Sequence, residues 1–143
     1  RRDRDRTSRV GLIYLDSCLV IYAFEDSGER GKNVRDLIGS EPSRQFAISP
    51  LVKLECLVAP MRDANLELQH HYEQGLEQFA QLPLGDDVFL RAAETRARFG
   101  IKTPDALHLA AAQIHHCEAL WTNDDRLVTA AHGLAVDVFR RSR

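Results

Sequence analysis

Short apolar runs alternate with stretches of helical periodicity along the chain. The run VGLIYL, at residues 10–15, contains no polar residue and stops at an aspartate. Uninterrupted runs of this length are typical of strands that are buried on both faces of a parallel sheet. The pattern predicts five strands, at residues 10–15, 46–48, 81–84, 119–122 and 134–138.

Helix signals fill the segments between these strands. Ser49–Pro50 and Thr103–Pro104 are both helix starts, because a hydroxyl can cap free amides and proline fits the first helical position. A stripe at helical spacing indicates packing in the core or in a dimer, and it consists of Leu68, Tyr72, Leu76 and Phe79. The predicted helices cover residues 17–24, a turn or more around 34–38, residues 50–62, 65–80, 86–99 and 103–116, and a short segment that ends near 131.

Strands that alternate with helices, without a long linker, predict an α/β fold, a three-layer α/β/α sandwich around a mainly parallel five-stranded sheet. The 143 residues suit one domain, which we expect at residues 10–143. Hydrophobic residues make up 44% and charged residues 28%, a composition that excludes disordered and fibrous chains. The three cysteines show no metal-ligand or disulfide spacing, and we expect them in the core.

Charge is unevenly distributed along the chain. Residues 1–9 hold five Arg and two Asp, whereas the formal net charge of the whole chain is −2. This basic segment is read either as a solvated tail or as a contact for nucleic acid. No apolar run reaches the ~20 residues that a membrane span needs, and the Arg-rich start lacks the apolar stretch of a secretory signal. We therefore expect a cytoplasmic protein with no membrane partner.

Two acids directly follow predicted strands. Asp16 ends the first apolar run, and Asp124 comes just after the run at 119–122. In open parallel sheets, ligands bind beyond the carboxyl ends of strands, above all where the strand order reverses. If these two strands are neighbours, the two carboxylates converge, although each residue alone also suits a turn or a helix cap.

Two further acids lie on predicted helices. Glu55 falls between Leu51 and Ala59 on the apolar face of its helix, so its carboxylate points inward and needs a cation, a metal or strong donors. Asp105 opens the helix that begins at Thr103, where a carboxylate also interacts favourably with the helix dipole. We expect both acids near the same edge of the sheet.

Four converging carboxylates need a counter-ion. Two like charges 4 Å apart repel by about 4 kcal/mol at an effective dielectric of about 20. All-oxygen sites suit Mg²⁺ or Mn²⁺, and such an ion can activate water and stabilise charge on a phosphodiester oxygen.

At these residues the sequence resembles the PIN-domain family, and within it the VapC-type ribonuclease toxins of bacterial toxin–antitoxin systems. The resemblance rests on four segments in order, IYLDSCLVIYAFE, ISPLVKLEC, KTPDALHLAAA and LWTNDDRL. It implies a five-stranded parallel sheet, frequent homodimers, an antitoxin partner, and cleavage of RNA that depends on Mg²⁺ or Mn²⁺. The residues that it matches to catalytic and metal-binding positions are Asp16, Glu55, Asp105 and Asp124.

Residues beside these four acids have open or minor roles. Ser17 and Thr122 match small hydroxyl residues near the metal in relatives, and they also suit a helix cap and a strand-end hydrogen bond. Cys18 stands where relatives often carry Asn or Ser, and Asp125 adds an acid that can share the role of Asp124. For His108 we favour packing or a hydrogen bond over metal ligation. The remaining candidates are Arg126 as an ion-pair partner of Asp124 or Asp125, His115 and His116 at a helix end, and Lys53, Arg62 and Lys102 as phosphate contacts.

The leading hypothesis is a divalent-metal-dependent endoribonuclease. A phosphatase with Asp16 as nucleophile is disfavoured, because such enzymes carry a second Asp where this chain has Cys18. A binding module without catalysis, acting through a protein partner, is disfavoured because a silent site has no need of four mutually repelling acids.

Overall fold

The computed structural model describes residues 11–40, 45–131 and 133–138. The basic segment predicted at residues 1–9 lies outside the described residues. Within them, no helix combines the length and the apolar character that crossing a membrane would require.

A parallel five-stranded sheet forms the centre of the fold, with strand order β3-β2-β1-β4-β5. In this order β1 and β4 are neighbours, and the strand order reverses between them. Leu15 of β1 lies opposite Trp121 of β4. The strands are β1 (Ile13–Leu15), β2 (Phe46–Ile48), β3 (Ala80–Gln81), β4 (Ala119–Thr122) and β5 (Ala135–Asp137). The predicted fold class is confirmed.

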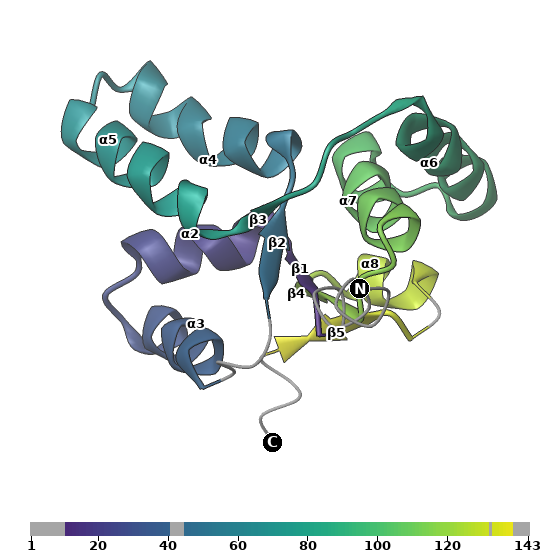
Figure 1. Cartoon of the computed structure of the whole chain (residues 1–143), viewed down its shortest axis with the longest axis horizontal. Coiled ribbons are helices and arrows are strands. Elements are labelled where there is room, and N and C mark those ends of the chain that lie inside the picture. The colour runs from purple at the N-terminus through teal and green to yellow at the C-terminus, as the bar shows by residue number, and fades with distance from the viewer. Residues whose placement is uncertain (1–10, 41–44, 132, 139–143) are drawn as a thin grey trace, which may run out of the picture.

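Helices cover both faces of the sheet. Figure 1 shows α2 to α5 on one side and α6 to α8 on the other, which makes three layers. Right-handed crossovers require this division, since β1 to β3 step in one direction across the sheet and β4 and β5 step in the other. The helices are α2 (Ser17–Glu25), α3 (Glu29–Gly39), α4 (Pro50–Arg62), α5 (Leu66–Gly75), the 3₁₀ turn η1 (Leu76–Gln78), α6 (Asp86–Phe99), α7 (Thr103–Ile114) and α8 (Asp125–Ala130).

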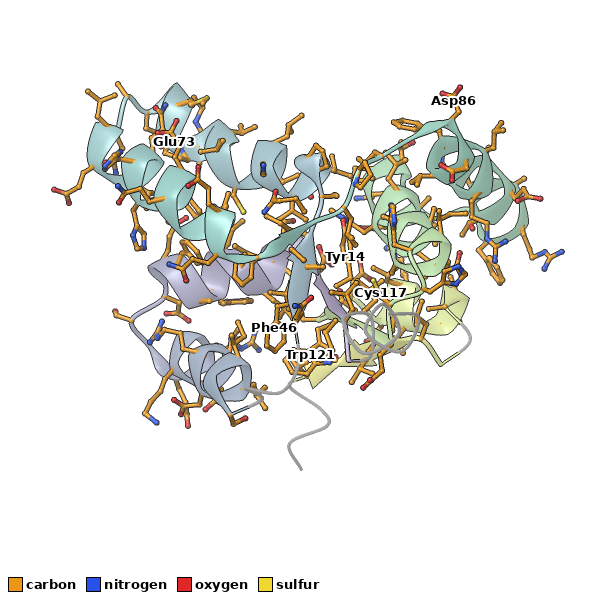
Figure 2. The ribbon with its side chains drawn as sticks, viewed as in Figure 1. Tyr14, Phe46, Glu73, Asp86, Cys117 and Trp121 are labelled. Atoms are coloured by element: carbon orange, nitrogen blue, oxygen red, sulfur yellow. The ribbon has the colours of Figure 1, made fainter. Side chains whose placement is uncertain are left out.

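The core lies between the sheet and these helices. Residues of β1, β2 and β4 are almost entirely inaccessible, and the rings of Phe46 and Trp121 pack edge to face with centroids 5.3 Å apart. Figure 2 shows these two rings beside the sheet, with Glu73 and Asp86 at the outer surface. Of the three cysteines, Cys56 and Cys117 are buried and Cys18 is half-buried, and all three are free thiols.

Two predicted elements differ from the structure. The helix predicted at residues 65–80 ends at Gly75, whose α-carbon lies so close to the ring of Phe24 that a β-carbon would stand 2.3 Å from it. The chain then turns through η1, and the strand predicted at 81–84 forms instead at Ala80–Gln81. Tyr72 and Leu76 are buried and the rest of that stripe packs against the core, so its role is core packing.

The predicted side-chain caps are also wrong. Ser49 occupies the N-cap position of α4, but its hydroxyl makes no cap bond and lies 2.7 Å from the hydroxyl of Tyr14 instead. The N-cap of α7 is Lys102, and Thr103 is already the first helical residue. Proline at the start of each helix, rather than a side-chain cap, marks these helix beginnings.

Candidate metal centre

The candidate site lies where β1 and β4 end side by side. Asp16 directly follows β1, and Thr122 is the last residue of β4. The strand order reverses between these two strands, which is where open α/β sheets bind ligands. The topology therefore brings together segments more than 100 residues apart in sequence.

Asp16 is the most buried of the four acids, with 6% of the residue exposed. It holds the N-cap position of α2, but its side chain makes no cap bond. Thr122 Oγ1 donates to Asp16 Oδ2 at 2.7 Å, and Ser17 Oγ donates to Oδ1 at 3.4 Å. Two hydroxyls thus orient the carboxylate toward the site and do not neutralise it.

Glu55 reaches the same site from α4. Its side chain is 27% exposed, and its Oε1 lies 2.7 Å from Nε2 of His108. Burial by itself would raise the pKa of this carboxyl, but the hydrogen bond and electrostatic attraction of His108, together with a hydrogen bond from Ser17, outweigh burial and hold the pKa below its usual range. The inward orientation predicted from the helix pattern is confirmed, and the required donor is His108.

His108 lies between the two carboxylates. The residue is 1% exposed, and its Nε2 lies 3.9 Å from Asp16 Oδ1. One ligand atom each from Asp16, Glu55 and His108 fall within 4.8 Å of one another. The packing or hydrogen bond expected for His108 is confirmed, and the sequence identified neither of its partners, Glu55 and Tyr14.

Asp105 stands half-buried in the first turn of α7. Burial raises the pKa of its carboxyl, and the negative charges of Asp124 and Asp16 raise it further. Asp105 and Asp124 lie outside the group within 4.8 Å, and the charges of Asp124, Asp16 and Glu55 act on the Asp105 carboxyl. The structure therefore brings Asp16 and Glu55 together, and Asp105 and Asp124 stay predicted ligands.

Asp124 has a structural role as well. It is the N-cap of α8, with Oδ1 accepting a hydrogen bond from the backbone N–H of Arg126 at 2.9 Å. Its own backbone N–H donates to Thr122 Oγ1 at 3.1 Å, which ties it to the hydroxyl that holds Asp16. Asp125 is exposed at the start of α8, whereas Asp124 is half-buried and its charge acts on Asp105, so Asp124 stays the preferred candidate of the two.

The residues present fit a hard divalent cation. The carboxylates of Asp16 and Glu55 lie together at the end of the sheet, and both ring nitrogens of His108 beside them have hydrogen-bond partners. Carboxylate oxygens are ligands of Mg²⁺ and Mn²⁺, and the charges of Asp124 and Asp16 add to burial in raising the pKa of Asp105. Asp16 and Glu55 are thus suited to hold such an ion, with Asp105 and Asp124 as the further candidate ligands.

Three other residues considered from the sequence, Cys18, His115 and Arg62, take no part in this cluster. Burial and the charge of Asp16 raise the pKa of the Cys18 thiol, which keeps the thiol protonated. His115, at the end of α7, bonds to the carbonyl of Pro83, and Arg62 pairs with Asp63 at the exposed end of α4.

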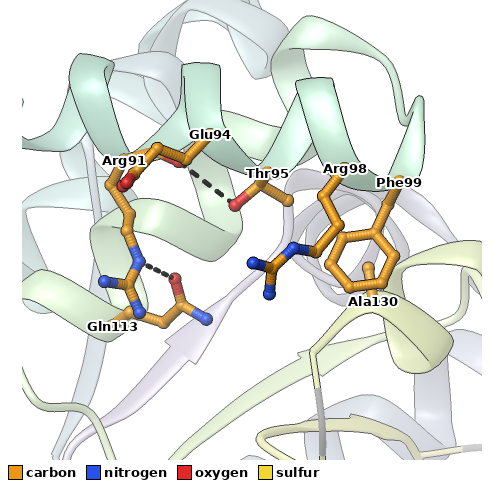
Figure 3. A pocket seen from close by; sticks show the side chains of 7 residues that line it. All are labelled: Arg91, Glu94, Thr95, Arg98, Phe99, Gln113 and Ala130. Atoms are coloured by element: carbon orange, nitrogen blue, oxygen red, sulfur yellow. Dashed lines mark hydrogen bonds between the residues drawn. The ribbon is translucent and has the colours of Figure 1, made fainter.

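A separate concave region lies between α6, α7 and α8, with a cavity of about 250 Å³ (Figure 3). Arg91 Nε donates to Gln113 Oε1 at its rim, and Thr95 Oγ1 donates to the backbone carbonyl of Arg91. Its walls mix two arginines with Glu94, and none of the four acids lines it.

A family model described as the PIN domain matches residues 13–133. No curated protein matched the sequence. Among solved structures, a toxin–antitoxin complex from Klebsiella pneumoniae has a chain that is 24% identical, with a TM-score of 0.73 and coverage of 88% of this chain and 97% of that one.

Two further structures share the fold. A chain of VapBC2 from Rickettsia felis, bound to a DNA fragment of its promoter, is 14% identical, with a TM-score of 0.75 and coverage of 87% and 97%. VapC20 from Mycobacterium tuberculosis, a toxin that cleaves the sarcin-ricin loop, is 15% identical, with a TM-score of 0.71 and coverage of 82% and 94%.

Proposed function

The chain belongs to the PIN domain family, and from that membership and its acidic cluster we propose that the protein is a divalent-metal-dependent endoribonuclease. The observation that carries the proposal is the buried carboxylate of Asp16, which lies beside Glu55 at the point where the strand order reverses. Clustered carboxylates repel one another, a divalent cation relieves that repulsion, and a nuclease can use such an ion.

In this proposal some side chains bind the ion and another positions them. Asp16, Glu55, Asp105 and Asp124 would hold the ion, which would supply activation of water and stabilisation of charge on the scissile phosphodiester. Thr122 fixes the orientation of Asp16 and, through the backbone of Asp124, the start of α8.

RNA approaches this site against a repulsive field. Lys102 is the N-cap residue of α7, three residues before Asp105, whereas Lys53 lies two residues before Glu55 on α4 and faces away from it. A cation at the position of Lys102 would offset the repulsion between the acids and the phosphates. We include Lys102 in the proposal as a phosphate contact.

We further propose that the protein is the toxin of a toxin–antitoxin pair, acting in the cytoplasm as a homodimer. Similar folds occur in solved toxin–antitoxin complexes, which supports this role. Exposed apolar side chains on α4 and at the start of α5 also suit a protein contact, and they are Leu54, Val58, Met61 and Leu66.

The test is direct. Purified protein is incubated with total RNA and Mg²⁺, Mn²⁺ or a chelator, and the cut ends are mapped. We expect metal-dependent cleavage that Asp16→Asn abolishes while the fold persists. Full activity of that variant would refute the assignment, and no Mn²⁺ binding at millimolar concentration would instead favour a binding module.

A further inference from the structure

A chain of hydrogen bonds runs through the interior from Ser49 to Glu55. The hydroxyls of Ser49 and Tyr14 are 2.7 Å apart, Tyr14 Oη lies 2.7 Å from His108 Nδ1, and His108 Nε2 lies 2.7 Å from Glu55 Oε1. Ser49, Tyr14 and His108 are each at most 1% exposed. Because these three groups are buried and hydrogen-bonded in series, each restricts the orientation of the next.

The four groups come from the sheet and from two helices on its opposite faces. Tyr14 is in β1, Ser49 follows β2, His108 is in α7 and Glu55 is in α4. The imidazole also packs against the Tyr14 ring, with centroids 5.6 Å apart. The ring of His108 is therefore fixed by the sheet, whereas Glu55 stands on a helix with its side chain partly open to solvent.

The chemistry of the end groups sets the direction of the bonds. An ionised carboxylate only accepts hydrogen bonds, so Nε2 of a neutral His108 must carry the hydrogen and donate it to Glu55. Nδ1 then accepts from the Tyr14 hydroxyl, which in turn accepts from Ser49. Within the described residues, no buried side-chain nitrogen or oxygen lacks a partner, so this arrangement satisfies the chain.

We propose that His108, oriented by Tyr14 and Ser49, is a positioning residue that holds Glu55 in place for the metal ion. This inference rests on the proposed function of the site. The imidazole does not touch the ion in this arrangement, since its Nε2 lone pair is replaced by the N–H that Glu55 accepts. Its effect is to select one conformation of a flexible glutamate beside Asp16.

The competing arrangement makes opposite demands on the same atoms. Nε2 lies within 4.8 Å of ligand oxygens from both Asp16 and Glu55, so it is close enough to serve as a ligand itself. That role requires a lone pair on Nε2 and the hydrogen on Nδ1, donated to Tyr14. The position of one hydrogen distinguishes the two arrangements.

The experiment measures Mn²⁺ affinity by calorimetry at fixed pH in a matched set of variants. His108→Leu removes the donor, and we expect the affinity to fall by about 10- to 100-fold, the usual effect of removing an outer partner of a metal ligand. His108→Gln places an amide N–H where Nε2 stood and should recover most of that loss. His108→Asn is the matched control, because its shorter amide reaches the Nδ1 position and not Glu55.

Two further measurements complete the test. In a Glu55→Gln background, His108→Leu should cause no additional loss, because its effect passes through Glu55. Nitrogen chemical shifts of the metal-free protein should show the hydrogen of His108 on Nε2, and Tyr14→Phe should weaken that preference. Thermal unfolding in chelator checks each fold, and His108→Asn replaces the leucine variant if that one does not fold.

Three results would overturn the inference: wild-type affinity in His108→Leu, equal losses in the glutamine and leucine variants, or nitrogen hyperfine coupling from His108 to bound Mn²⁺. Failure of the proposed function looks different. A wild-type protein that binds Mn²⁺ but cleaves no RNA would contradict the nuclease, while the order of affinities would still decide the role of His108.

Discussion

Replacing Asp16 with Asn should stabilise the metal-free protein while abolishing its response to metal. Asp16 is buried, and its ligand oxygen lies within 4.8 Å of that of Glu55. At an effective dielectric of about 20, two unit charges at this separation repel by about 3.5 kcal/mol. Asparagine removes that repulsion.

Asp16→Asn also weakens the hydrogen bonds that the carboxylate accepts. The amide oxygen of Asn can still accept the hydrogen bond from Thr122, but the NH₂ group cannot accept from Ser17 and faces the imidazole of His108. A hydrogen bond to a charged group contributes about 1.5–3 kcal/mol. The net expectation is a gain of about 0.5–2 kcal/mol in the free energy of unfolding.

Urea unfolding at neutral pH, in chelator and then in Mn²⁺, measures both effects. Wild-type protein should gain about 2.7 kcal/mol at a Mn²⁺ concentration one hundred times its Kd, so the order of stability reverses when metal is added. Glu73→Gln, on the exposed face of α5, is the control for loss of an acid outside the site. The reasoning is refuted if Asp16→Asn is the less stable protein in chelator, or if Mn²⁺ stabilises it as much as wild type.

Two further predictions follow from the structure. Burial and the charge of Asp124 raise the pKa of Asp105, so the metal-free protein should lose stability as pH rises above the ordinary Asp range. Asp105→Asn should remove that loss in urea midpoints measured from about pH 4 to 7. Parallel pH profiles for the variant and the wild type would contradict the prediction. A β-carbon at Gly31 would lie 2.0 Å from the carbonyl oxygen of Asp26, so Gly31→Ala should lower the free energy of unfolding by about 1–3 kcal/mol. In the same helix, a β-carbon at Gly39 meets nothing within 4 Å, so Gly39→Ala should be neutral or stabilising. Equal urea midpoints for the two variants would contradict the prediction, because they would show that the chain relaxes the contact.

Most of the fold could be predicted because the central strands are short and uniformly apolar. Residues 46–48 and 119–122 form strands at the predicted bounds, and the helix at 86–99 also has its predicted limits. The end of α5 at Gly75 was missed because the apolar stripe continues through Leu76 and Phe79. The close contact of Gly75 with the ring of Phe24, from another helix, also leaves no local sign in the sequence.

The meeting of Asp16 with the end of β4 could be predicted for a topological reason. Carboxyl ends of neighbouring parallel strands meet at one edge, so Asp16 after β1 lies beside Thr122 at the end of β4. The partner of Glu55 was harder to find. His108 shares a helix with Asp105, which is a signal, but Tyr14 looks like an ordinary core residue and Ser49 looks like a helix cap.

The proposed function requires these carboxylates to hold a divalent ion beside β1 and β4. Anomalous diffraction from a crystal soaked in Mn²⁺ tests it by locating the metal. We expect one or more anomalous peaks at ligand distance from Asp16, with oxygens of the other acids as further ligands and His108 hydrogen-bonded to Glu55. A saturated crystal with no peak at Asp16, or with Mn²⁺ bound only elsewhere, would contradict it.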